Sequence, residues 1–120
     1  MGRDTKISIA NKKEYLELVN VHNNLCIEAD PTLYIANEAK AIKLEELAFS
    51  EGSLVYWGKR DCSLAVHFFR QFKSDDGDLI ITKEIFQKLE KESLLDDNIL
   101  KTIKRILKRR DDLLIIFSTG

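Results

Sequence analysis

Apolar residues along this chain alternate between helix-like and strand-like spacing, and this alternation constrains the fold more than any other feature of the sequence. In chain order, the predicted elements are a strand at 6–9, helices at 11–26 and 32–49, strands at 53–57, 63–72 and 79–81, helices that begin at 82 and 93, and a strand at 113–117. The order is therefore β-α-α-β-β-β-α-α-β. It is typical of an α+β fold in which four helices pack on a mixed or antiparallel sheet of about five strands.

The first predicted helix has a clear start and a regular apolar stripe. Asn11 is suited to the N-cap position, and Glu14 three residues later completes a capping-box pattern. The positions that form the stripe are separated by three or four residues: Tyr15, Leu18, Val19, His22, Leu25 and Cys26. Because this spacing places side chains on one face of a helix, we expect that face to be buried.

The second predicted helix is less regular. Asp30 followed by Pro31 is a typical helix start, and the residues up to Phe49 are mostly helix formers. The apolar residues of this segment do not keep to one stripe. The sequence leaves two interpretations open: one helix buried on several sides, or a break near residues 36–37, with a short strand at 33–35 as the competing structure.

A β-hairpin is predicted in the middle of the chain. Residues 53–57 are β-branched and aromatic, residues 58–61 are turn-like, and residues 63–72 are again strand-like. In the second of these strands, apolar side chains occupy both alternating sets of positions. A strand of that kind is usually central and covered on both faces. Trp57 would be a partner contact if its ring were exposed.

The last predicted helix separates apolar from basic residues. Its apolar side is formed by Ile99, Leu100, Ile103, Ile106 and Leu107. The opposite side carries five cations, which are Lys101, Lys104, Arg105, Lys108 and Arg109. This basic stripe has three interpretations: a solvated face whose cations complement the helix dipole, a contact for an acidic protein, or a contact for phosphates.

Length and composition limit the class of protein. A chain of 120 residues predicts one domain spanning 1–120, with residues 1–5 as a disordered N-terminus. Nineteen Lys and Arg nearly balance 20 Asp and Glu, which excludes nucleic-acid binding through bulk charge alone. The sequence shows neither a membrane span of ~20 apolar residues nor an export signal, and it has only two cysteines. We therefore expect a cytoplasmic protein with reduced thiols and no membrane partner.

Two histidines and two cysteines could form a metal site. His22 and Cys26 are four residues apart on a predicted helix, and Cys62 and His67 lie near the start of a predicted strand. Zinc favours such a set, but structural zinc sites usually include a tight knuckle of two cysteines, which neither pair provides. We therefore predict no metal ion, no cofactor and no metal ligands for this chain.

Catalytic sets are equally weak in the sequence. Cys62, His67 and Asp61 are the only compact nucleophile-and-base candidates, and an Asp in a turn has a local structural explanation. Glu38-Ala39-Lys40 with Asp30 fits a fragment of a nuclease metal site, but helix formers surround it. The sequence therefore favours a protein that is not an enzyme, and it identifies no catalytic residue.

A binding role is the function that these exclusions leave. We expect stoichiometric association with another macromolecule, most simply another protein, as a regulator, an inhibitor or immunity-type protein, or an accessory subunit. The predicted contacts are the basic stripe, Trp57 and an acidic loop formed by Asp75, Asp76 and Asp78. The alternative is a nucleic-acid-associated protein that uses the basic helix at 101–110, and a third hypothesis is a metal-dependent hydrolase or nuclease. The oligomeric state remains open.

Overall fold

The fold is built on a four-stranded antiparallel sheet. The computed structural model describes residues 5–50, 52–58, 63–72 and 77–119. The strands are β1 (Thr5–Asn11), β2 (Ser53–Trp57), β3 (Gly77–Ile80) and β4 (Leu113–Thr119). Their order across the sheet is β2-β1-β4-β3, and every neighbouring pair is antiparallel. The prediction of an α+β fold is confirmed, with the sheet wholly antiparallel.

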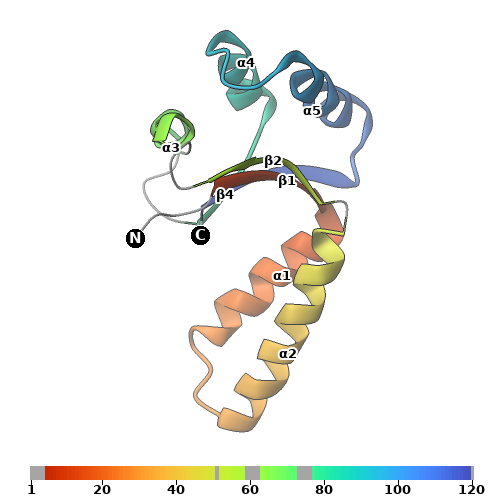
Figure 1. The fold of residues 1–120 in the computed structure, drawn as a ribbon. Helices are drawn as coiled ribbons and strands as arrows, with labels where there is room; N and C mark the ends of the chain where they lie inside the picture. The colour runs from red at the N-terminus through yellow and green to blue at the C-terminus, as the bar shows by residue number, and fades with distance from the viewer. Residues whose placement is uncertain (1–4, 51, 59–62, 73–76, 120) are drawn as a thin grey trace.

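Five helices lie on the two sides of this sheet (Figure 1). They are α1 (Lys12–Leu25), α2 (Pro31–Ala48), α3 (Ser63–Phe69), α4 (Lys83–Lys91) and α5 (Asp97–Arg109). In Figure 1, α3, α4 and α5 lie on one side of the sheet, whereas α1 and α2 form an antiparallel pair that projects from the other side. We refer to residues 12–48 as the helical hairpin.

The larger core lies between the sheet and helices α3, α4 and α5. The rings of Phe69 on α3 and Phe117 on β4 stack with centroids 3.8 Å apart, and both are fully buried. Leu89 on α4 and Ile103 on α5 close the same core. Their helices show the predicted amphipathic spacing, so the sequence correctly located these buried faces.

The predicted strand at 63–72 is wrong, because residues 63–69 form α3. The buried residues Ala65, Phe68 and Phe69, with half-buried Phe72, are spaced by three, one and three positions, which fits one face of a helix. A short apolar run fits a buried strand and a buried helix alike, and tertiary packing decides between them. The structure therefore has five helices and four strands among its described residues, and β2 pairs with β1.

The irregular segment after Pro31 is a single helix. Asp30 caps it by accepting hydrogen bonds from the backbone N–H of Thr32 (2.9 Å) and of Leu33 (3.4 Å). This finding excludes both the break near residues 36–37 and the competing strand at 33–35. The helix is not buried on several sides either, since its buried residues are confined to Ala41, Leu44 and Ala48.

The first helix buries a different face from the predicted one. Asn11 caps it by accepting from the N–H of Glu14 at 3.2 Å, as expected from the capping pattern. Its buried residues, however, are Tyr15, Leu18 and Val21. Val19, His22 and Cys26, which the stripe predicts to be buried, are exposed, because α1 contacts α2 along only one edge of that stripe.

The projecting hairpin makes the molecule elongated. Its radius of gyration is 15.4 Å, whereas a compact chain of this length would have about 14 Å. The principal extents are 48 × 36 × 21 Å. Thr5, which was predicted to belong to a disordered N-terminus, is buried in β1, and residues 1–4 of that prediction lie outside the described residues.

Candidate binding site on the helical hairpin

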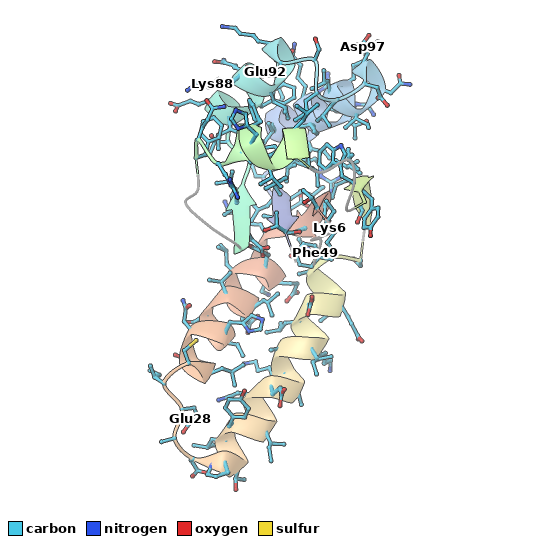
Figure 2. The ribbon with its side chains drawn as sticks, turned by 60° about the vertical axis from the view of Figure 1, so that its left-hand side comes forward. Lys6, Glu28, Phe49, Lys88, Glu92 and Asp97 are labelled. Atoms are coloured by element: carbon cyan, nitrogen blue, oxygen red, sulfur yellow. The ribbon has the colours of Figure 1, made fainter. Side chains whose placement is uncertain are left out.

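The base of the helical hairpin is fixed to the sheet by a small aromatic cluster. Tyr15 and Phe49 meet edge to face with centroids 5.9 Å apart, and they cover Ala10 and Ile116 of the sheet. The ammonium group of Lys6 lies 5.8 Å from the centroid of the Phe49 ring. Figure 2 places Lys6 and Phe49 at this junction, with Glu28 at the far end of the hairpin.

One hydrogen bond ties the hairpin to an edge strand. The hydroxyl of Tyr15 donates to the carboxylate of Asp78 on β3 over 3.0 Å. Burial of the phenol raises the pKa of Tyr15 well above its usual range, and the charge of Asp78 and the hydrogen bond to it act in the same direction. Tyr15 therefore stays protonated, and remains a donor to Asp78, at every pH at which the protein is expected to work.

The two helices of the hairpin contact each other along a narrow seam. The seam is formed by Leu18 and Val21 on α1 and by Ala41 and Leu44 on α2. On one side of it, Lys40 and Glu17 form an ion pair with 3.9 Å between Nζ and Oε1. Both of these side chains are about half exposed, so the pair adds little to stability.

Large apolar side chains gather on the exposed surface of the hairpin. Eight of the eleven that the structure shows exposed among its described residues lie there: Leu16, Val19, Ile27, Leu33, Tyr34, Ile35, Ile42 and Leu47. Scattered exposed apolar residues are normal on a soluble protein, whereas a concentration on one element marks an interaction surface. Among the described residues, the large exposed apolar side chains are therefore concentrated on one projecting element.

A groove of about 400 Å³ runs between the two helices on one face of the hairpin. Its lining residues are His22, Leu25, Cys26, Tyr34, Glu38, Ala41, Ile42 and Glu45. On α2, residues 34, 38, 41, 42 and 45 follow helical spacing, so they form one continuous wall. The part of the predicted α1 stripe that α2 does not cover, His22 and Cys26, forms the opposite wall.

The groove is apolar with an acidic wall. Glu38 and Glu45 are its only carboxylates among the described lining residues, and none of those residues is Lys or Arg. Cys26 is a free, exposed thiol beside His22. The arrangement offers apolar contact area and two negative charges, which are properties of a recognition surface.

The basic stripe lies on the other side of the sheet. Each of its five cations on α5 is exposed, and none forms an ion pair with a carboxylate in the described part of the chain. Figure 2 shows Asp97, at the start of α5, at the opposite end of the molecule from Glu28. The basic stripe and the groove are therefore separate surfaces.

The other predicted contacts are dispersed. Asp75 and Asp76 lie outside the described residues, and Asp78 is exposed but accepts the hydrogen bond from Tyr15. Trp57 is half-buried and packs against the larger core. Asp78 contacts the helical hairpin, on the opposite side of the sheet from the basic stripe on α5.

The candidate metal and catalytic residues are also separated. His22 and Cys26 line the groove, His67 lies on α3 on the other side of the sheet, and Cys62 and Asp61 lie outside the described residues. Asp30 caps α2 at the tip of the hairpin. Within residues 5–50, 52–58, 63–72 and 77–119, no group of three or more His, Cys, Asp or Glu side chains is placed to hold a metal ion.

Sequence reasoning missed the groove, although its signal was present. The apolar residues of α2 do not keep to one stripe, and this was interpreted as burial on several sides or as a break in the helix. A third interpretation is correct: the helix is continuous, and its additional apolar residues, such as Ile35 and Ile42, face solvent. Helical spacing alone would have placed Tyr34, Glu38 and Ile42 together.

No protein-family description, curated protein or solved structure matches this chain. Among the described residues, no helix combines the length and the apolar character that crossing a bilayer requires. The site must therefore be interpreted from its own geometry.

Proposed function

We propose that this protein acts by stoichiometric binding to another protein, and that the helical hairpin is the surface that binds. The single observation that carries the proposal is the concentration of exposed apolar side chains on the hairpin. Ile35 is 66% exposed and Ile42 is 57% exposed, on a helix that needs neither for its own packing. Each would gain favourable free energy on burial against a partner.

The composition of the surface supports a protein partner. The exposed surface of the hairpin combines aliphatic side chains with one aromatic ring, Tyr34, and with charged side chains, which is the usual make-up of a protein interface. A regulator, an inhibitor or immunity-type protein, or an accessory subunit would act through such a surface without any catalytic group. We place this role in the cytoplasm, where a reducing environment would keep the exposed Cys26 as a thiol.

Site-specific photo-crosslinking in cells tests the proposal. A photoreactive amino acid at Ile35 on the hairpin is compared with the same group at Leu64 on α3, an exposed apolar residue on the other side of the sheet. We expect a discrete crosslinked protein from position 35, and we expect it to disappear when Ile42→Ser is added. Crosslinks from position 64 alone, or equal crosslinks from both positions, would contradict the proposal.

A second candidate function is nucleic-acid binding by α5. It is favoured by the five exposed cations of the basic stripe, which lack carboxylate partners in the described part of the chain. The test is retention on single- and double-stranded DNA and RNA at increasing salt, with Lys104→Glu/Arg105→Glu as the variant. Binding that falls linearly with log salt and is lost in the variant supports this function, and unchanged retention rejects it.

A further inference from the structure

We infer that the groove between α1 and α2 binds an amphipathic helix of a partner protein, with Lys or Arg residues two helical turns apart facing Glu38 and Glu45. This inference rests on the proposed function, because it names the class of segment that the hairpin recognises. It is carried by the shape of the groove, by the placement of its charges and by the absence of a matching segment on the chain's own described surface.

The shape of the groove fits a helix. Two antiparallel helices leave a channel along their seam, and a third helix can bury an apolar stripe in that channel. Ala41 on α2 has a small side chain and is almost fully buried, so it forms a shallow floor there. Tyr34 and Ile42, about two turns apart on the same wall, supply further apolar contacts in the groove.

The charges of the groove select the partner. Glu38 and Glu45 are seven residues apart on α2, which is about 10.5 Å along the helix axis. The cations nearest in sequence, Lys40 and Lys43, do not line the groove, and Lys40 pairs with Glu17 on the other side of the seam. Two carboxylates beside an apolar channel would therefore attract a segment that carries cations at a spacing of about seven residues.

A second copy of this chain is a poor occupant. Two grooves facing each other would bring four carboxylates to one apolar interface, and the described lining residues offer no Lys or Arg to compensate them. The basic amphipathic helix α5 has a suitable charge, but Ile103 and Ile106 on its apolar side are buried in the larger core. An acidic groove would also be repelled by anionic lipid.

The test uses two designed peptides and the 120-residue chain. Both peptides are 18-residue helices with the same leucine stripe, and they differ only in carrying Lys or Glu at two flanking positions seven residues apart. Fluorescence anisotropy should show the Lys peptide binding at least about tenfold more tightly than the Glu peptide. The preference should shrink as salt rises, because added salt screens the charges.

Charge-reversal variants connect this preference to the groove. Glu38→Lys/Glu45→Lys should reverse it, so that the Glu peptide binds more tightly. The matched control, Glu90→Lys/Glu92→Lys, changes net charge equally at exposed positions at the end of α4 and should leave the preference unchanged. Ile42→Ser should weaken both peptides together, since it removes an apolar contact.

Several outcomes would overturn the inference. Equal binding of the two peptides, or a preference that the control variant also reverses, would show that the groove does not recognise charge spacing. A concentration-dependent dimer in sedimentation, or binding to phosphatidylcholine/phosphatidylglycerol vesicles, in either case lost in Ile42→Ser, would assign the groove to a second copy or to lipid. If neither peptide binds while crosslinking from position 35 persists, this inference fails and the proposed function stands.

Discussion

The two helix pairs of this molecule use the same sheet in opposite ways. Helices α4 and α5 lie against one face of the sheet and bury their apolar sides there. Helices α1 and α2 touch the other face only near Tyr15, Ala48 and Phe49, and most of their length extends beyond it. Helices α4 and α5 complete the larger core, whereas α1 and α2 are attached to the sheet at their base.

The two pairs also differ in how well the positions of their apolar residues agree with the positions that are buried. In α5 the apolar residues occupy one side, the cations occupy the other, and only the apolar side is buried. In α2 the apolar residues surround the helix, although only Ala41, Leu44 and Ala48 are buried. Apolar surface that folding does not bury is the surface available to a partner.

Truncating the larger core should cost the most stability. Phe69→Ala removes a fully buried ring that stacks on Phe117, and we expect a loss of about 3–5 kcal/mol in the free energy of unfolding. Urea denaturation measures this loss. The control Leu64→Ala, at an exposed position of the same helix, should change stability by less than about 0.5 kcal/mol. Similar losses for both variants would mean that α3 is not packed as described.

Truncating the seam of the hairpin should act locally. Leu44→Ala removes a buried contact between α1 and α2, and we expect a loss of about 2–3 kcal/mol. Hydrogen exchange should show the amides of residues 12–48 losing protection while those of β1 and β4 keep most of theirs. Leu47→Ala, exposed on the same helix, is the control. Uniform loss of protection would show that the hairpin and the sheet unfold together.

Removing the Tyr15 hydroxyl should weaken the junction. We expect Tyr15→Phe to cost about 1 kcal/mol, because it deletes the hydrogen bond to Asp78 and keeps the ring. Stability of the unaltered protein should fall as pH rises above about 10, the ordinary pKa of tyrosine, since the unfolded chain then loses a proton that folded Tyr15 retains.

Urea denaturation between pH 8 and 11 tests this dependence. Below pH 10 both forms of Tyr15 are protonated, so this group adds no slope there. Tyr15→Phe should lack the part of the decline that begins near pH 10. An identical decline in both proteins would contradict the assignment of that slope to Tyr15.

Substituting the exposed residues of the hairpin should barely change stability. We expect Ile42→Ser to alter the free energy of unfolding by less than about 0.5 kcal/mol, because its side chain lines the groove and packs little in the free protein. Binding of the Lys peptide should nevertheless weaken several-fold. A large loss of stability with no loss of binding would show that this side chain stabilises the fold and does not contact a partner.

Most of the fold could be predicted from local patterns in the sequence. The caps at Asn11, Asp30 and Thr82 marked three helix starts, and amphipathic spacing marked the buried sides of α4 and α5. The last helix starts later than the predicted residue 93, because Asp96 is its N-cap and α5 begins at Asp97. The strand wrongly predicted at 63–69 has a physical cause, since a short run of apolar residues fits both the spacing of a buried helix and that of a buried strand. Which one forms depends on the pairing of β1 with β2 and β4, which no local pattern contains.

The candidate site was harder to predict than the fold. Conspicuous charge in the sequence favours the basic stripe as a contact, and the histidine–cysteine set was considered as a metal site and rejected; neither feature indicates the groove. The groove depends on which edge of α1 meets α2, and this choice exposes His22 and Cys26 while burying Val21. Only the tertiary contact decides between those two edges.

The way the hairpin joins the sheet has a consequence for how this protein can vary. β1 and β2 are adjacent antiparallel strands, and the backbone N–H of Ile9 donates to the carbonyl of Gly52 at the point where the chain returns. Residues 12–52 are thus an elaborated version of a connection that could be a short turn. Adding or deleting matched helical turns near the tip, between Leu25 and Leu33, would lengthen or shorten the arm while leaving every strand in register. The reach of the arm can therefore diverge among versions of this protein faster than the body that holds it.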